Sequence, residues 1–185
     1  LLGNAHEVAE SVACLKGEGP EDTMQLVRMQ GAALGADVDA VIADGSALEA
    51  FAQMCRRQGV DQATIMALLE DPWSILPRGG TRTTLVAPAS GWISDIDALA
   101  LGRALVQIGA GRTHPDDVLD LGAGIELLAT VGAHVEAGAP LAHIDHSMAD
   151  GVPDVAGAFV IGAEAVSPPG SRLMETIGPR QKGAR

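Results

Sequence analysis

The sequence predicts an α+β fold, with helices over residues 1–78 and a mixture of strands and helices over residues 79–185. Three observations support this prediction. Apolar residues in the first 70 or so positions recur at helical spacing. A segment rich in proline and glycine, residues 71–80, interrupts that pattern, and Trp73 and Ile75 are expected to attach it to a core. Beyond it, short β-rich runs alternate with turn residues.

Five helices are expected before the interruption, because apolar residues recur every three or four positions and glycines end most of the runs. Ser46 and Glu49 have the form of a capping box, and Asp61 is a plausible cap for the last helix. The expected helices span His6–Lys16, Glu21–Leu34, Asp37–Ala43, Ser46 to the residue before Gly59, and Asp61–Leu69.

The second part is expected to contain two helices among several strands. Asp97 is the expected cap of the first helix, which ends at Ile108 before a Gly-Ala-Gly turn. The second helix is expected over Asp154–Val166. The expected strands are Thr83–Ala87, Trp92–Ile96, Val118–Ile125, Pro140–Ile144 and a short one at Arg172–Ile177.

Charge and composition restrict the partners. Twelve Lys and Arg residues against 24 Asp and Glu residues give a formal net charge of −12, and only four residues are Phe or Trp. Nucleic-acid binding needs a basic surface, so it is not expected. Apolar runs are too short for a membrane span and no basic leader opens the sequence. Cys14 and Cys55, far apart in sequence, favour a reducing, cytoplasmic compartment.

Three motifs resemble a dinucleotide-binding loop, a carrier domain and a zinc site, but the residues that each of these needs are missing or misplaced. Residues 109–114 follow a helix and lack the third glycine of a dinucleotide-binding loop. The two half-motifs around Trp92 and Val135 resemble those of biotinyl and lipoyl carrier domains, but the only lysines are Lys16 and Lys182, outside them. His114, His134, His143 and His146 lie within one predicted domain, but zinc binding is only a minor alternative. Alternation sends the members of the segment 143–146 to different faces of a strand, no cysteine is near, and there is no H-E-x-x-H pattern.

Six segments in order resemble the thymidine and pyrimidine-nucleoside phosphorylase family over residues 1–165. The opening L-G-N-A-H-E-V of Leu2–Val8 is similar to the family's G-N-A-x-E-V, and residues 15–22 are similar to its L-K-G-E-G-P-E-D. Four further segments are similar to A-x-x-x-G-x-V, A-L-G…G-A-G-R, D-x-x-V-G and I-G-D-x-V-x-x-G, namely residues 87–93, 98–112, 120–125 and 131–138. Each match is short, but their common order makes the set specific.

The resemblance implies the C-terminal portion of an α/β enzyme. Residues 1–78 would be a helical part of the central α/β domain, and residues 79–185 the family's α/β-hammerhead domain. Such an enzyme uses phosphate to cleave thymidine, deoxyuridine or uridine into the free base and a (deoxy)ribose 1-phosphate. The family's phosphate-binding segments precede G-N-A-x-E-V, so no catalytic or cofactor-binding residue is expected here. The intact enzyme is expected to be a cytoplasmic homodimer, and the isolated chain inactive.

Two alternatives remain open at this point. A relative that acts on nucleoside monophosphates, such as the AMP phosphorylases of this superfamily, would share the same segments. A non-enzymatic interaction module with the hammerhead architecture is the second. Because the first residue is leucine rather than methionine, we expect the sequence to be a fragment of a longer protein.

The resemblance also implies part of a monovalent cation site, usually for potassium. By position, Glu10 would supply a carboxylate and Leu1 a main-chain carbonyl. Hard oxygen donors of this kind suit a weakly polarising cation. The family's other ligands precede Leu1, so no bound cation is expected in the fragment itself. The alternative for Glu10 is a solvated helix carboxylate without a ligand role.

Overall fold

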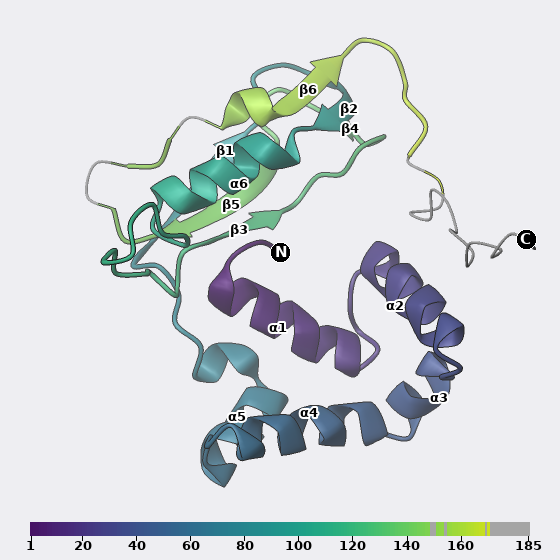
Figure 1. Ribbon diagram of the computed structural model, residues 1–185. Coiled ribbons are helices and arrows are strands. Elements are labelled where there is room, and N and C mark those ends of the chain that lie inside the picture. The colour runs from purple at the N-terminus through teal and green to yellow at the C-terminus, as the bar shows by residue number, and fades with distance from the viewer. Residues whose placement is uncertain (149–150, 154, 169, 171–185) are drawn as a thin grey trace, which may run out of the picture.

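The computed structural model describes residues 1–148, 151–153, 155–168 and 170. It confirms the α+β prediction: helices come first, and antiparallel sheets follow (Figure 1). The N-terminal helical elements are α1 (Asn4–Leu15), α2 (Glu21–Ala33), α3 (Val38–Ala43), α4 (Ser46–Arg57), α5 (Gln62–Glu70) and the short 3₁₀ helix η1 (Pro72–Ser74).

The helices begin and end for local reasons that the sequence largely predicts. Asp61 caps α5 by accepting the backbone N–H of Thr64 at 3.0 Å, as expected. The capping box is wrong: Gly45, with a φ of 77°, precedes α4, and the Ser46 hydroxyl donates to the carbonyl of Val41 instead. Within the described residues, no helix combines the length and apolar character that crossing a bilayer requires.

The strands form two three-stranded antiparallel sheets. The strands are β1 (Thr81–Val86), β2 (Gly91–Ile96), β3 (Gly124–Leu127), β4 (His134–Val135), β5 (Pro140–His146) and β6 (Phe159–Gly162). In the first sheet, with the order β1-β5-β3, the long strand β5 is central; in the second, with the order β4-β2-β6, strand β2 is central. The predicted domain boundary at residue 78 falls between η1 and β1 and stays a prediction.

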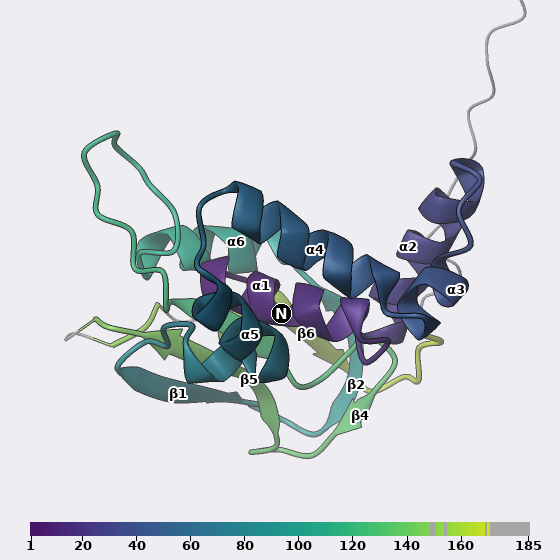
Figure 2. The same ribbon diagram turned by 90° about the horizontal axis from the view of Figure 1, so that it is seen from below.

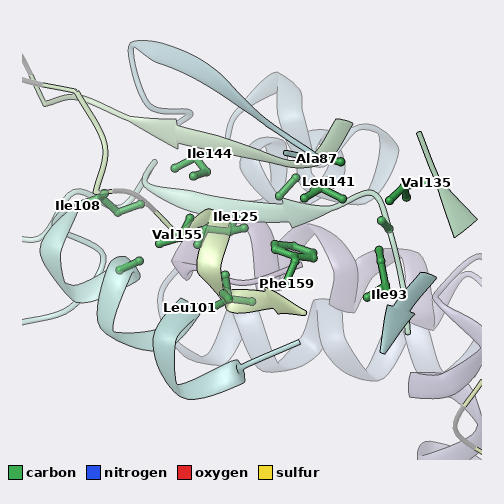
Figure 3. Packing of buried hydrophobic residues seen from close by; sticks show 14 of the residues in the cluster. Ala87, Ile93, Leu101, Ile108, Ile125, Val135, Leu141, Ile144, Val155 and Phe159 are labelled. Atoms are coloured by element: carbon green, nitrogen blue, oxygen red, sulfur yellow. The ribbon is translucent and has the colours of Figure 1, made fainter. Parts of the chain in front are cut away.

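The main apolar core lies between the sheets and helix α6 (Ala98–Gln107), as Figure 3 shows. Leu101 of α6 packs in one buried cluster with strand residues such as Ile125 and Phe159. All buried members of this cluster lie within residues 87–159, and Leu2 packs against it from the N-terminal part. The C-terminal part therefore carries a core of its own. Helix α1 lies beside its strand β3 (Figure 1), and α4 lies next to α1 (Figures 1 and 2).

Two predicted elements of the C-terminal part are wrong. The strand expected at Val118–Ile125 is a loop in which Val118 is 92% exposed, and strand β3 begins only at Gly124. Asp120 explains the loop, because its carboxylate accepts the N–H of Gly122 and so closes a tight turn.

The helix expected at Asp154–Val166 is replaced by a 3₁₀ turn, η2 (Ala156–Ala158), and strand β6. Phe159, Val160 and Ile161 favour a strand, and β6 completes the edge of the sheet beside β2. Asp154 itself, and the strand expected at Arg172–Ile177, lie outside the described residues.

The cap of helix α6 gives a first testable prediction. Asp97 Oδ1 accepts the backbone N–H groups of Leu99 at 2.9 Å and Ala100 at 3.0 Å. We expect Asp97→Ala to lower the free energy of unfolding by about 1 kcal/mol, because two N–H groups lose their acceptor. Urea denaturation measures this loss. Asp95→Ala removes the same charge from an exposed strand position and serves as the control; equal losses in both variants would contradict the capping role.

Candidate functional site

The structure brings together the two residues expected at the cation site. The amino nitrogen of Leu1 donates to Oε2 of Glu10 at 2.6 Å, and the two side chains are 23% and 19% exposed. Glu10 is therefore not a fully solvated helix carboxylate. The contact is made by the nitrogen of Leu1, whereas the resemblance assigns the carbonyl oxygen of the same residue to the cation.

Backbone pairing with the sheet holds this pair in place. Leu2 exchanges two hydrogen bonds with Ile125 of β3, at 2.9 and 2.8 Å, so it extends the edge of the sheet. Gly3 then turns the chain into α1 with a φ of 117°. A Cβ at Gly3 would lie 2.6 Å from the carbonyl oxygen of Ala123, so only glycine fits between β3 and the helix.

Glu10 lines a groove of about 410 Å³ whose wall is otherwise largely apolar, with Met24 of α2 and Ile42 of α3 among the lining residues. Leu1 is not among the residues that line it, and Glu10 is the one carboxylate in that lining. A cation held by Glu10 and the carbonyl of Leu1 therefore stays a prediction from the resemblance.

In the part of the chain that the structure describes, no group of three or more His, Cys, Asp or Glu residues could hold a metal ion. A cation at Glu10 would therefore need main-chain oxygens and ligands from outside that part.

A buried polar network lies one helical turn before Glu10 and joins α1 to the sheet. Nε2 of His6 lies 2.9 Å from Oδ2 of Asp145 on β5, and both residues are almost fully buried. Arg82 on β1 binds the same carboxylate with two hydrogen bonds of 2.7 Å each, from Nε to Oδ1 and from Nη2 to Oδ2. An ionised carboxylate only accepts, so the network assigns the proton of His6 to Nε2.

The network keeps Asp145 ionised in spite of its burial. Burial by itself raises the pKa of the Asp145 carboxyl, but the hydrogen bonds from Arg82 and His6 together hold that pKa below its usual value. The same pairing raises the pKa of Arg82. Glu126, whose Oε2 lies 3.4 Å from Nη1 of Arg82, adds a second, more exposed carboxylate.

Trp73 of η1, in the segment of residues 71–80, covers one side of the network. Its ring meets the imidazole of His6 edge-on, with 5.0 Å between ring centroids, and the guanidinium of Arg78 lies 3.9 Å from the centroid of the Trp73 ring. These contacts confirm that Trp73 attaches residues 71–80 to the rest of the fold. Ile75, which was expected to do the same, is 40% exposed.

The four histidines considered for zinc make separate contacts. His143 and His146 lie on opposite faces of β5, and bind the neighbouring residues Thr84 and Thr83 of β1 respectively. His134 lies at β4 beside Trp92, with Nδ1 3.6 Å from Glu136 Oε1, and His114 is in an exposed loop.

Sequence reasoning missed the partnership of His6, Arg82 and Asp145. One signal was present: Asp145 stands at the end of an apolar strand, and a buried carboxylate needs a cationic or hydrogen-bonding partner. The partner could not be found from the spacing, because His6 lies 139 positions earlier in the sequence.

Comparisons with known proteins agree with this architecture. Residues 92–160 match a family model described as the pyrimidine nucleoside phosphorylase C-terminal domain. The chain is 37% identical over 156 residues to human thymidine phosphorylase, and 37% identical over 153 residues to the pyrimidine-nucleoside phosphorylase of Bacillus subtilis. These alignments cover 75% and 76% of this chain but only 32% and 34% of the two relatives, so the chain spans about a third of their length.

The matched domain defines the class of protein: residues 92–160 form a domain of the kind found at the C-terminus of pyrimidine nucleoside phosphorylases. The family is that of the thymidine and pyrimidine-nucleoside phosphorylases, which confirms the resemblance drawn from the six motifs.

Proposed function

We propose that the protein containing these residues uses phosphate to cleave thymidine or another pyrimidine nucleoside, and that this chain supplies its C-terminal part. The observation that carries the proposal is the 37% identity, over three quarters of the chain, to relatives that bear these two enzyme names. The products would be the free base and a (deoxy)ribose 1-phosphate. We propose further that the intact protein is a cytoplasmic homodimer.

Within that enzyme, the N-terminal helices would complete the central domain and carry part of a potassium site. Glu10 would hold the cation with its carboxylate and Leu1 with its carbonyl oxygen. The low exposure of the Glu10 side chain, 19%, supports this assignment, because a fully solvated carboxylate would be more exposed. Bound potassium would offset negative charge near the phosphate-binding segment.

The groups that promote bond cleavage would come from outside this chain. The developing charge on the sugar, phosphate and base has to be stabilised by cationic and hydroxyl donors. The chain contains only two lysines, Lys16 and Lys182, and the guanidinium of Arg82 is already bound to Asp145. These observations favour a supporting role for the chain.

We therefore expect purified residues 1–185 to release no thymine from thymidine and phosphate, whereas the protein extended upstream by its own gene sequence should do so. The measurement is base release from thymidine, uridine and AMP, with and without phosphate. Release of adenine from AMP alone would assign the protein to the nucleoside monophosphate relatives. An extended protein that is folded but inactive on all three would contradict the proposal and favour an interaction module.

A further inference from the structure

The largely apolar groove beside Glu10 faces solvent in the described part of the chain. Its wall is formed by α1, α2 and α3, with Ala47 of α4. Val27 of α2 and Val41 of α3, both in this wall, are 38% and 37% exposed. Helix α2 buries only Met24, and no residue of α3 is buried. A partner that covered the groove would therefore gain free energy from apolar burial.

Residues 171–185, which follow the described part of the chain, have the composition of such a partner. They contain three large apolar residues, Leu173, Met174 and Ile177, among mostly polar and basic ones. Leu173 and Ile177 are four positions apart, a spacing that places two side chains on the same side of either a strand or a helix. Both side chains can therefore contact one apolar wall together.

Charge favours contact between this segment and the N-terminal helices. Residues 171–185 contain four Lys or Arg residues and one Glu, a formal side-chain charge of +3. Residues 1–45, which include α1, α2 and α3, contain eight Asp or Glu residues and two Lys or Arg residues, a formal charge of −6. Opposite charges attract the segment toward the groove. A second copy of the chain, with its net charge of −12, would instead be repelled.

The segment also starts within reach of the groove. Residues 163–168, which follow β6, run toward the side of the molecule on which α2 lies (Figures 1 and 2). Residues 171–185 can span about 50 Å when fully extended, more than the diameter of a small domain. We propose that residues 171–185 bind in the groove between α1, α2 and α3 of the same chain, with Leu173 and Ile177 on its apolar wall. This contact is independent of the proposed reaction.

The chain contains its own probe and reference for a test, because Cys14 lines the groove and Cys55 does not. The experiment measures how fast N-ethylmaleimide alkylates each thiol, in residues 1–185 and in a chain that ends at Gly170. A synthetic peptide of residues 171–185 is then added to the shortened chain, with a scrambled peptide as its control. In the full chain, Ile177→Asp places a charge against the apolar wall, and Gln181→Asp, which adds the same charge in place of a polar residue, is the matched control.

We expect Cys14 to react about tenfold faster in the shortened chain than in the full chain, whereas the rate at Cys55 stays the same. A tether holds the segment at about millimolar effective concentration, so a Kd of about 0.1 mM leaves the groove about nine-tenths occupied. Ile177→Asp should expose Cys14 nearly as much as the deletion does, and Gln181→Asp should stay within about twofold of the parent. The peptide should restore the protection, and the scrambled peptide should not.

Three outcomes would overturn the inference. Equal rates at Cys14 with and without residues 171–185 would show that the segment does not cover the groove. Protection that rises with protein concentration would assign the groove to a second copy of the chain. Protection that survives the deletion in a protein extended upstream would assign it to an upstream segment. If the shortened chain unfolds, which a faster rate at Cys55 would reveal, the comparison of Ile177→Asp with Gln181→Asp decides the question.

Discussion

Replacing Gly124 with valine is expected to lower the free energy of unfolding by about 3 kcal/mol, because it forces a side chain into a packed contact. Gly124 of β3 lies opposite Asp145, and the imidazole of His6 lies where a Cβ would be. The His6 ring is held by Asp145 and by Trp73, so it has little room to move. Either α1 shifts away from the sheet or the strands separate.

Urea denaturation followed by circular dichroism measures this loss, and an unchanged dependence on urea concentration would show that the variant still unfolds in one step. Gly102→Ala in helix α6 is the control, since a Cβ there meets open space and alanine favours a helix. The control should be as stable as the parent or slightly more so. Equal stability of the Gly124 variant would refute the close packing of His6 on β3.

Asp145→Asn should cost about 3 kcal/mol at pH 7, since the guanidinium of Arg82 and the imidazole of His6 lose the charge that they share. The value falls at the low end of the range for broken buried pairs because Arg82 is 36% exposed and water recovers part of the loss. The free energy of unfolding of the two proteins, measured by urea denaturation, tests this difference. Glu126→Gln, at the exposed end of the network, should cost far less.

The difference between parent and Asp145→Asn should also depend on pH. The pKa of the Asp145 carboxyl is lower in the folded than in the unfolded protein, so its stabilisation is complete above about pH 4 and is lost as the pH falls through the folded pKa. The two stability curves should therefore converge in acid. Parallel curves from pH 7 to pH 3 would show that Asp145 is not the ionised acceptor.

Local signals in the sequence predicted much of the fold. The Asp61 and Asp97 caps and the helical periods place α1 to α6 within a few residues of their true bounds. The two wrongly predicted elements of the C-terminal part share a cause. Residues 118–125 and 154–166 have mixed local preferences, so hydrogen bonds determine their structure. In the first segment Asp120 closes a turn, and in the second strand β6 pairs with β2.

For the candidate site, the sequence indicated only those residues whose positions a family motif specifies. The resemblance implied that Leu1 and Glu10, which lie on either side of G-N-A-x-E-V, belong to one site. The structure places the nitrogen of Leu1 2.6 Å from Glu10, whereas a cation bound by the Leu1 carbonyl stays a prediction. His6 occupies the variable position of the same motif, so nothing in the motif indicated a role for it. Its partner Asp145 becomes a neighbour only when β5 packs beside β3, which is a consequence of the tertiary fold.

The link between His6 and Asp145 also bears on how such proteins can exchange parts. A genetic crossover anywhere between the two positions would join one parent's helix to another parent's sheet. The hybrid would keep the buried link only if the donor of the sheet carried a carboxylate at position 145 and the donor of the helix a matching hydrogen-bond donor at position 6. A hybrid that takes only one of these two positions from this protein should therefore lose the link and be less stable than one that takes both.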